Sequence, residues 1–158
     1  MSLTIVLGIG NRMGGDDAAG ACLVDELSRG RPPAKGPFSA ELVAIDAGTA
    51  PESYTSIIRQ RRPDLLILVD AADMGLLPGT LRTIQPDKIS VLSFSTHSMP
   101  LSLFISYVEK FCGRVVLVGM QPRQTQIATR VSKEVRKSAK ELAEVILEGQ
   151  IAEIPLLQ

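Results

Sequence analysis

Runs of apolar residues alternate along this chain with stretches in which apolar residues recur every three or four positions. The runs predict strands over residues 3–9, 41–48, 65–69 and 114–122, and a short strand within 78–86. The helical spacing predicts helices over about 16–29, 51–61, 99–112 and 129–148. Prolines, glycines and polar residues indicate loops over 30–38, 86–98 and 122–129.

Strands that alternate with helices of this length predict βαβ units. The expected fold is α/β, a three-layer α/β/α sandwich with a twisted, mostly parallel five-stranded sheet. The apolar run at 65–69 is typical of a central strand buried on both faces. With 158 residues, no internal repeat and no linker, the chain is expected to form a single domain over 1–158.

Charge and cysteine content exclude several classes of protein. Lys+Arg and Asp+Glu both number 17, and no basic stripe with interleaved aromatic residues is present, so no nucleic-acid partner is expected. The amino-terminal residues lack a basic segment and a cleavage site, and no apolar run approaches the roughly 20 residues that span a bilayer. Cys22 and Cys112 are far apart, which predicts reduced thiols in a cytoplasmic protein.

The segment from Leu7 to Gly20 joins the first strand to the first helix through a glycine-rich loop that ends in two acids. Acids in a first helical turn suit the helix dipole, and a loop after the first strand of an α/β protein is where ligands bind. A dinucleotide loop would require a third glycine where Met13 stands. Asp16 and Asp17 would also repel a phosphate, and the Gly-Lys-Ser/Thr of a P-loop is absent.

Further polar side chains follow the other predicted strands. Because the carboxyl ends of parallel strands form the ligand crevice, these residues are expected to gather at one edge of the sheet. Each acid, taken singly, is also a common helix cap or turn former. The set comprises Asn11, Asp16, Asp17, Asp46, Asp70, Asp73 and, from a later loop, the chain's single histidine, His97.

Several reactions can be considered for this group. Ser95 and Ser98 flank His97, but the nucleophile elbow of a serine hydrolase is absent. The segment at Asp46 matches an aspartic-protease site only faintly. Two carboxylates and one imidazole suit borderline divalent ions such as nickel, zinc or iron, and three protein ligands leave coordination positions open. These residues therefore leave two interpretations open, a metal site and a set of acids that cap helices.

Five segments in this order resemble those of the hydrogenase maturation endopeptidases, most closely the type that serves formate-hydrogenlyase-like [NiFe] hydrogenases. The resemblance covers roughly residues 3 to 122 and does not extend to the last helix. Its segments are GIGNRMGGDDAAG, DAGTAPE, LVDAADMGLLPGTLR, THSMPL and VGMQP.

The resemblance implies a twisted sheet between helices and an endopeptidase classed with the aspartyl peptidases. Such enzymes remove a C-terminal extension from the precursor of the hydrogenase large subunit after nickel has been inserted. By motif position, Asp17, Asp70 and His97 contact the nickel, which the substrate carries; some members have Glu at the first position. Asp16 is expected to cap the helix, and Asp73 and Glu52, which lie in matching motifs, receive no direct role.

The expected partner is the large-subunit precursor, which a monomer binds transiently. The glycines at positions 10, 14 and 15 would let the partner's backbone approach. For cleavage we expect a water molecule to attack the scissile carbonyl, with Asp17 or Asp70 as general base. Two alternatives are considered: a non-catalytic nickel checkpoint or chaperone that uses the same three residues, and a metal hydrolase with its own bound ion.

Overall fold

The computed structural model describes residues 2–29, 40–95, 99–127 and 129–158. The strands are β1 (Ser2–Ile9), β2 (Ala40–Gly48), β3 (Leu65–Asp73), β4 (Leu81–Ile84), β5 (Ser93–Phe94) and β6 (Arg114–Met120). The α-helices are α1 (Ala19–Arg29), α2 (Thr55–Arg61), α3 (Pro86–Ile89), α4 (Leu101–Val108) and α5 (Lys133–Leu147). Short 3-10 turns are η1 (Gly15–Ala18), η2 (Pro51–Tyr54), η3 (Glu109–Phe111) and η4 (Ile151–Glu153).

The sheet has the order β2-β1-β3-β6-β4. Strands β2, β1, β3 and β6 run parallel, and β4 runs antiparallel to β6. This confirms the predicted mostly parallel five-stranded sheet. The short strand β5 adds a sixth by pairing antiparallel with the end of β3. Together with α3, it occupies part of the segment 86–98 that the sequence predicts to be mostly loop.

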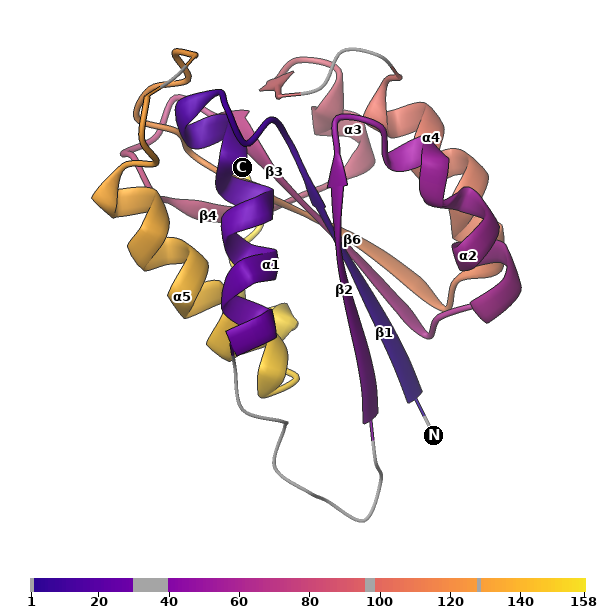
Figure 1. Ribbon diagram of the computed structural model, residues 1–158. Helices are drawn as coiled ribbons and strands as arrows, with labels where there is room; N and C mark the ends of the chain where they lie inside the picture. The colour runs from indigo at the N-terminus through magenta and orange to yellow at the C-terminus, as the bar shows by residue number, and fades with distance from the viewer. Residues whose placement is uncertain (1, 30–39, 96–98, 128) are drawn as a thin grey trace.

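Helices cover both faces of the sheet, as the three-layer prediction requires (Figure 1). Helices α1 and α5 lie on one face, and α2, α3 and α4 lie on the other. The apolar run of β3 supplies both layers: Ile67 and Val69 pack toward α1 and α5, whereas Leu66 and Leu68 pack toward α2 and α4. This double burial explains why the strand shows no alternation of apolar and polar residues.

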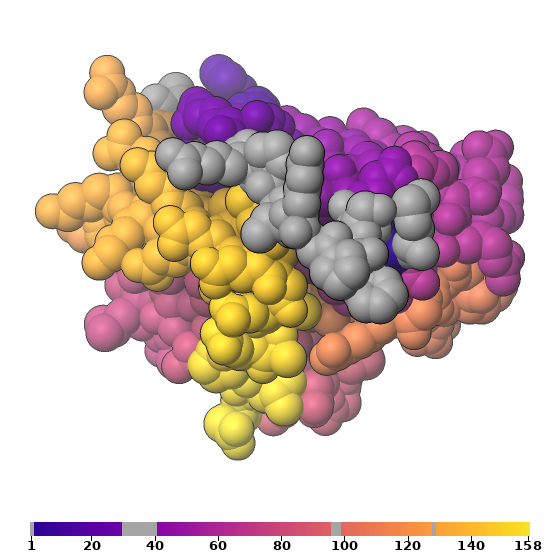
Figure 2. Space-filling model, turned by 90° about the horizontal axis from the view of Figure 1, so that it is seen from below, coloured from indigo at the N-terminus to yellow at the C-terminus, as the bar shows by residue number. Residues whose placement is uncertain are grey.

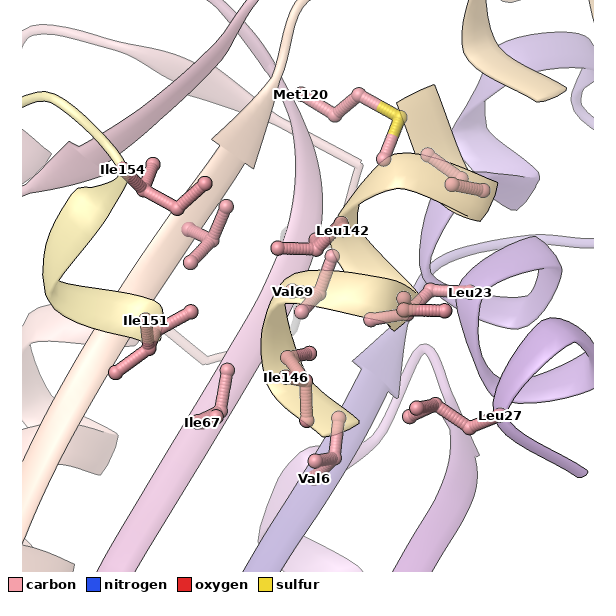
Figure 3. Close-up of a cluster of buried hydrophobic side chains, with 14 of the residues drawn as sticks. Val6, Leu23, Leu27, Ile67, Val69, Met120, Leu142, Ile146, Ile151 and Ile154 are labelled. Atoms are coloured by element: carbon pink, nitrogen blue, oxygen red, sulfur yellow. The ribbon is translucent and has the colours of Figure 1, made fainter. Parts of the chain in front are cut away.

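The core on the α1–α5 side is aliphatic and closely packed (Figure 3). Leu23 of α1 and Leu142 of α5 have no solvent exposure, and they face Val6 and Val69 of the sheet. The end of the chain closes this core through Ile151 and Ile154. Burial of side chains of this size stabilises the fold by about 1.5–3 kcal/mol each.

The C-terminal segment follows the edge of the sheet. Leu156 forms a bridge with Thr83 of β4, and the view from below shows the yellow terminal residues on the surface, flanked by the pink region of the chain (Figure 2). Cys22 and Cys112 are both unpaired and partly buried. Among the described residues, no helix has both the length and the apolar character needed to cross a membrane.

The four parallel strands all end at the upper edge of the molecule in Figure 1. The loops that follow β1, β3 and β6 lie there, together with the segment around β5. The first predicted helix begins there as the 3-10 turn η1, which carries both predicted acids, before α1 starts at Ala19. The fold therefore brings segments from distant parts of the sequence to one edge.

Candidate active site

Asp70 lies near the end of the central strand β3, and its side chain has no solvent exposure. One carboxyl oxygen, Oδ1, accepts a hydrogen bond from the Ser95 hydroxyl. The other, Oδ2, is buried and has no hydrogen-bond partner among the described residues. Burial raises the pKa of Asp70 well above its ordinary value, and the negative charge of Asp17 raises it further, against the opposing effect of the Ser95 hydrogen bond.

Asp17 reaches this site from the turn η1, with a half-buried side chain. Gly10 makes the approach possible because its φ of +140° suits glycine, and a Cβ on it would lie 1.8 Å from the Asp17 carbonyl oxygen. The same Cβ would lie 3.2 Å from the Ser95 hydroxyl oxygen. Gly10 therefore lies between the backbone of Asp17 and the hydroxyl of Ser95, which in turn donates to Asp70. The loop after the first strand thus converges with the segment that contacts the end of the third strand.

The third predicted metal ligand, His97, lies outside the described residues. The described chain reaches Ser95 on one side of it and resumes at Met99 on the other. Within the described ranges, no group of three or more His, Cys, Asp or Glu side chains is placed to hold a metal ion. The structure thus brings two of the three predicted residues together, and the place of His97 remains a prediction.

The sequence did not predict the role that Ser95 has at this site. The sequence suggested it only as a nucleophile beside His97, whereas its hydroxyl holds the Asp70 carboxylate. Its position follows from the pairing of β5, in which Phe94 faces Ala72 and Ser93 faces Asp73. A two-residue strand has no sequence pattern of its own, so only the antiparallel register reveals this contact.

Asp16 does not cap the helix that follows it, which corrects the sequence prediction. The turn η1 has no side-chain cap, and the Asp16 side chain is fully buried against a distant segment. Its Oδ2 accepts from the Arg123 backbone N–H at 2.8 Å and from the Ser132 hydroxyl at 2.8 Å. Its Oδ1 accepts from the Ser132 backbone N–H at 2.7 Å. Asp16 therefore ties the loop after β6 to the start of α5.

This tie explains why α5 begins later than predicted. Ser132 is the N-cap residue of α5, and its hydroxyl accepts from the Val135 N–H at 3.3 Å while it donates to Asp16. Residues 129–131, which the sequence pattern assigned to the helix, belong instead to the loop that Asp16 binds. Tertiary hydrogen bonds therefore set this helix boundary.

The glycines of the first loop accommodate the chain's own segments, which corrects the prediction that they make room for a partner. A Cβ on Gly15 would lie 2.5 Å from the Thr129 hydroxyl oxygen and 2.6 Å from Oε1 of Gln124. A Cβ on Gly14 would lie 3.2 Å from Oδ2 of Asp17. The space that these residues leave is already filled.

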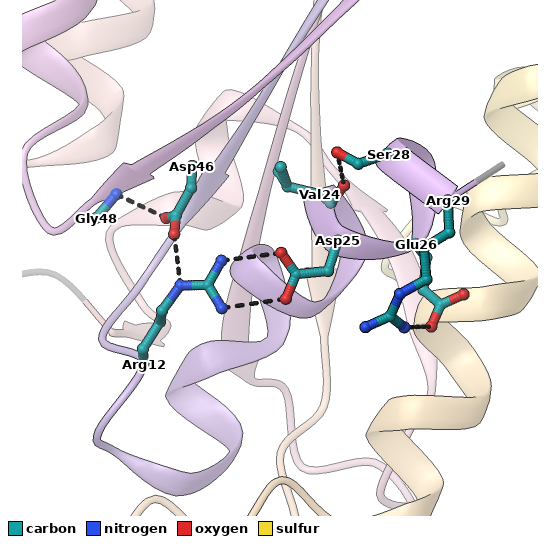
Figure 4. A network of polar contacts seen from close by, with 8 residues as sticks. All are labelled: Arg12, Val24, Asp25, Glu26, Ser28, Arg29, Asp46 and Gly48. Carbon is teal, nitrogen blue, oxygen red and sulfur yellow. Dashed lines mark hydrogen bonds and ion pairs between the residues drawn. The ribbon is translucent and has the colours of Figure 1, made fainter.

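Asp46, which lies near the end of the second strand, belongs to an ion-pair network separate from Asp17 and Asp70 (Figure 4). Arg12 donates from Nε to Asp46 at 2.7 Å, and its two terminal nitrogens donate to both carboxyl oxygens of Asp25. These hydrogen bonds, with Asp25 contributing most, raise the pKa of Arg12, and the same contact lowers the pKa of Asp25. The network connects the first glycine loop to α1 and β2, which is a structural role.

Asp73 also has a structural role. Its Oδ1 accepts from the Gly75 N–H at 3.2 Å and from the Gln121 amide nitrogen at 3.1 Å. Gln121 in turn accepts from the Met74 N–H at 2.6 Å. Asp73 thus shapes the turn between β3 and β4, and the predicted cluster of acids separates into structural residues and the Asp17–Asp70 pair.

An open α/β sheet with a strongly perturbed carboxyl group at its carboxyl edge is the arrangement of an α/β enzyme that binds its ligand there. The family model described as hydrogenase maturation protease matches residues 23–149. Hydrogenase 3 maturation protease of Escherichia coli K12 is 41% identical over 119 residues, which are 75% of this chain and 72% of that protein. A putative hydrogenase maturation protease of Methanocaldococcus jannaschii is 34% identical over 146 residues, 91% of this chain and 86% of that protein.

Solved structures agree with these sequence relationships. The crystal structure of the Hydrogenase 3 maturation protease superposes with a TM-score of 0.86 at 32% identity and covers 99% of this chain and 97% of that one. The [NiFe] hydrogenase maturation protease HycI of Thermococcus kodakarensis gives a TM-score of 0.78 at 33% identity, with 94% and 92% covered. The chain belongs to the hydrogenase maturation protease family, and it is a peptidase, a hydrolase that acts as an endopeptidase in hydrogenase maturation.

Proposed function

We propose that this endopeptidase removes the C-terminal extension of a [NiFe]-hydrogenase large-subunit precursor after nickel insertion. The observation that supports this most is the pair formed by Asp70 and Asp17 at the carboxyl edge of the sheet. Asp70 presents a buried oxygen with no partner among the described residues, although an unpaired buried acceptor costs free energy. A site built for a cation that arrives with the substrate would retain such an oxygen.

The nickel is part of the substrate in this proposal. Asp17, Asp70 and His97 contact the ion in the precursor, and carboxylate oxygens with an imidazole nitrogen form a donor set suited to it. Because an unloaded precursor lacks the ion, it forgoes these contacts, and the protease distinguishes the two forms by affinity. The bound ion also lowers the barrier by polarising the scissile carbonyl or the attacking water.

The protein residues supply the proton transfers. A carboxylate of Asp17 or Asp70 takes the proton from the attacking water as the new carbon–oxygen bond forms. The proton then goes to the nitrogen of the scissile bond, so that the extension leaves as a free amine. The raised pKa of Asp70 makes this carboxyl a stronger base than an exposed aspartate.

Exposed apolar side chains around this edge support a folded protein as the partner. Met13, Leu77, Val91 and Ile127 are 63%, 80%, 78% and 78% exposed. They lie in the loop after β1, in the turn between β3 and β4, in the segment before β5 and in the loop after β6. Apolar residues exposed around a functional edge are typical of an interaction surface.

Incubation with purified precursor, with and without nickel, followed by mass measurement tests the proposal. The expected result is loss of the C-terminal extension from the nickel-loaded form alone. Binding without cleavage would identify a nickel checkpoint or chaperone instead. Metal analysis of the purified protease separates the remaining alternative, because an ion held tightly before substrate arrives would make this a metal hydrolase with its own ion.

A further inference from the structure

The two edge strands of the sheet differ in what lies beyond them. Beyond β4 lies the C-terminal segment: the Thr83 N–H donates to the Pro155 carbonyl at 2.8 Å, and the Leu157 N–H donates to the Thr83 carbonyl at 2.9 Å. At the other edge, β2 pairs with β1, and within the described ranges no strand pairs with its outer side. Helices α1 and α2 lie on either side of β2 (Figure 1). The chain therefore closes one edge of its sheet and leaves the other open in the part that the structure describes.

Two hydrogen bonds show which residues of β1 bond to β2. The Gly10 N–H donates to the Gly48 carbonyl at 2.8 Å, so the even-numbered residues of β1 direct their backbone groups toward β2. The Asp64 N–H, just before β3, donates to the Leu3 carbonyl at 2.9 Å, so the odd-numbered residues direct theirs toward β3. The alternation along β1 is therefore fixed at both of its ends.

The register of the pairing transfers this alternation to β2. In a parallel pair, the residues of one strand that bond across the pair lie opposite residues of the other that face away. By this register, the odd-numbered residues of β2 up to position 45 bond to β1, and the backbone groups of Leu42 and Ala44 face outward. The next even-numbered residue agrees, because the Asp46 carbonyl accepts from the Tyr54 hydroxyl, which lies outside the sheet, at 3.4 Å.

Leu42 and Ala44 thus present two N–H donors and two carbonyl acceptors along an extended backbone. Among the described residues, no backbone hydrogen bond outside the β1 pairing reaches either residue. Their side chains are half-buried against the core on the α1–α5 side, which holds the strand in place. Residues 42–45 are all apolar, without the lysine or proline that commonly protects an edge strand. Such an edge is a template for one more strand.

This edge leads directly to the candidate active site. Strand β2 ends at Gly48, which bonds to Gly10, and Gly10 lies between the Asp17 backbone and the Ser95 hydroxyl. A strand added beyond β2 would lie three strand spacings, about 14 Å, from β3, which carries Asp70. About four extended residues cover this distance. A peptide that leaves the carboxyl edge and turns along β2 runs against it, which gives antiparallel pairing.

We propose that the outer edge of β2 binds the C-terminal extension of the precursor as an added antiparallel strand. The first residues of the extension, about four, cross from the catalytic edge, and the following ones pair with Leu42 and Ala44. Main-chain hydrogen bonds supply the affinity in this mode of recognition. The inference rests on the proposed function, and it adds where the extension is held and in which conformation.

The test uses Ala44→Pro, which removes one outward N–H at a position where an edge strand tolerates proline. With nickel-loaded precursor, we expect KM to rise about tenfold with kcat nearly unchanged, because the residues proposed to act on the scissile bond are untouched. Single prolines placed along the extension should raise KM at every second position beyond about the fourth residue, because hydrogen bonds to an antiparallel neighbour alternate. These prolines should cause no further rise with Ala44→Pro.

Lys133→Pro, at the exposed first position of α5, is the matched control and should leave KM unchanged, because a helix tolerates proline there. An unchanged KM for Ala44→Pro, or a proline scan without alternation, overturns the inference. It is also overturned if Ala44→Pro converts a dimer into a monomer at constant KM, because the edge would then pair two copies of this chain. Failure of the wild-type protease to cut nickel-loaded precursor refutes the proposed function instead.

If thermal melting shows that Ala44→Pro is unfolded, amide hydrogen exchange in the wild-type protein replaces it. The probe is nickel-free precursor in excess, which the proposed function leaves uncut. We expect exchange at Leu42 and Ala44 to slow at least tenfold, while exchange at Val43 and Ile45, already bonded to β1, stays the same. Unchanged exchange at Leu42 and Ala44 is equally contrary to the inference.

Discussion

Asp16 and Asp70 both have side chains without solvent exposure, but the groups around them differ. Asp16 accepts hydrogen bonds on both oxygens, from the backbone and hydroxyl of a distant segment. Asp70 accepts one from Ser95 on Oδ1, and its Oδ2 is unpaired among the described residues. The first carboxylate has donors on both oxygens, whereas the second has one oxygen without a donor in the part of the chain that the structure describes.

This difference distinguishes an acid with a structural role from the acid proposed to take part in the reaction, although both are aspartates and both are buried. A buried charge with a complete set of donors fixes the segments that supply them. A buried carboxyl with an incomplete set shifts its pKa and costs stability, which is characteristic of functional sites. The largest consequences should therefore appear in activity for Asp70 and Asp17, and in stability for Asp16.

The strongest expected effect is loss of cleavage in Asp17→Asn and Asp70→Asn. Removal of a general base lowers rates by about 10²- to 10⁴-fold, and each change also removes a charge that would contact the nickel. Cleavage of nickel-loaded precursor, followed by mass measurement, gives the rate. Asp25→Asn, a change in the exposed ion-pair network, serves as the control. Full-rate processing by Asp17→Asn and Asp70→Asn would contradict the assignment of these two residues to the active site.

Asp16→Ala should chiefly destabilise the fold. The change leaves the buried donors of Arg123 and Ser132 without an acceptor, and we expect a loss of about 3 kcal/mol in the free energy of unfolding. For a chain of this length, this corresponds to a melting temperature lower by about 10 °C. Asp25→Ala, in the exposed ion pair with Arg12, should cost at most about 1 kcal/mol. Equal losses in the two variants would remove the distinction.

Ser95→Ala tests whether the hydrogen bond from the Ser95 hydroxyl positions the Asp70 carboxylate. Loss of a residue that orients a reacting group typically costs about tenfold in rate. Ser95→Thr keeps the hydroxyl and should restore most of the activity, whereas a merely structural effect would show in the melting temperature of both variants. Activity of Ser95→Ala at the wild-type rate would separate Ser95 from catalysis.

The smallest expected effect is a gain of stability in Asp70→Asn. Burial raises the folded-state pKa of Asp70, so its contribution to stability is complete below the unfolded pKa of about 4 and is lost as pH rises through the folded value. At neutral pH, the free energy of unfolding of Asp70→Asn should therefore be about 1 kcal/mol higher than that of the wild type. Denaturant titrations from pH 4 to 8 measure this, and wild-type and variant curves that stay parallel would show that Asp70 titrates normally.

The sequence indicated the convergence of Asp17 and Asp70 more securely than the places of the other acids. Asp17 follows the first strand and Asp70 lies near the end of the third. Because parallel strands end at one edge, the convergence of these two residues follows from the order of elements. Asp46 lies near the end of the second strand, yet its carboxylate pairs with Arg12 in an exposed network. The pattern predicts the edge at which a side chain lies and leaves its partner undetermined.

Periodicity and the alternation of elements by themselves determined the α/β sandwich, the order of its main helices and strands, and the edge at which the candidate site lies. These features depend on contacts between near neighbours in sequence and on repeated spacing, both of which the chain displays directly. Only the tertiary structure decided that Asp16 binds a loop more than 100 residues away, that Ser95 holds Asp70, and that the C-terminal segment covers β4. Such pairings depend on how distant segments pack against the sheet, and no local pattern encodes which donor meets which acceptor.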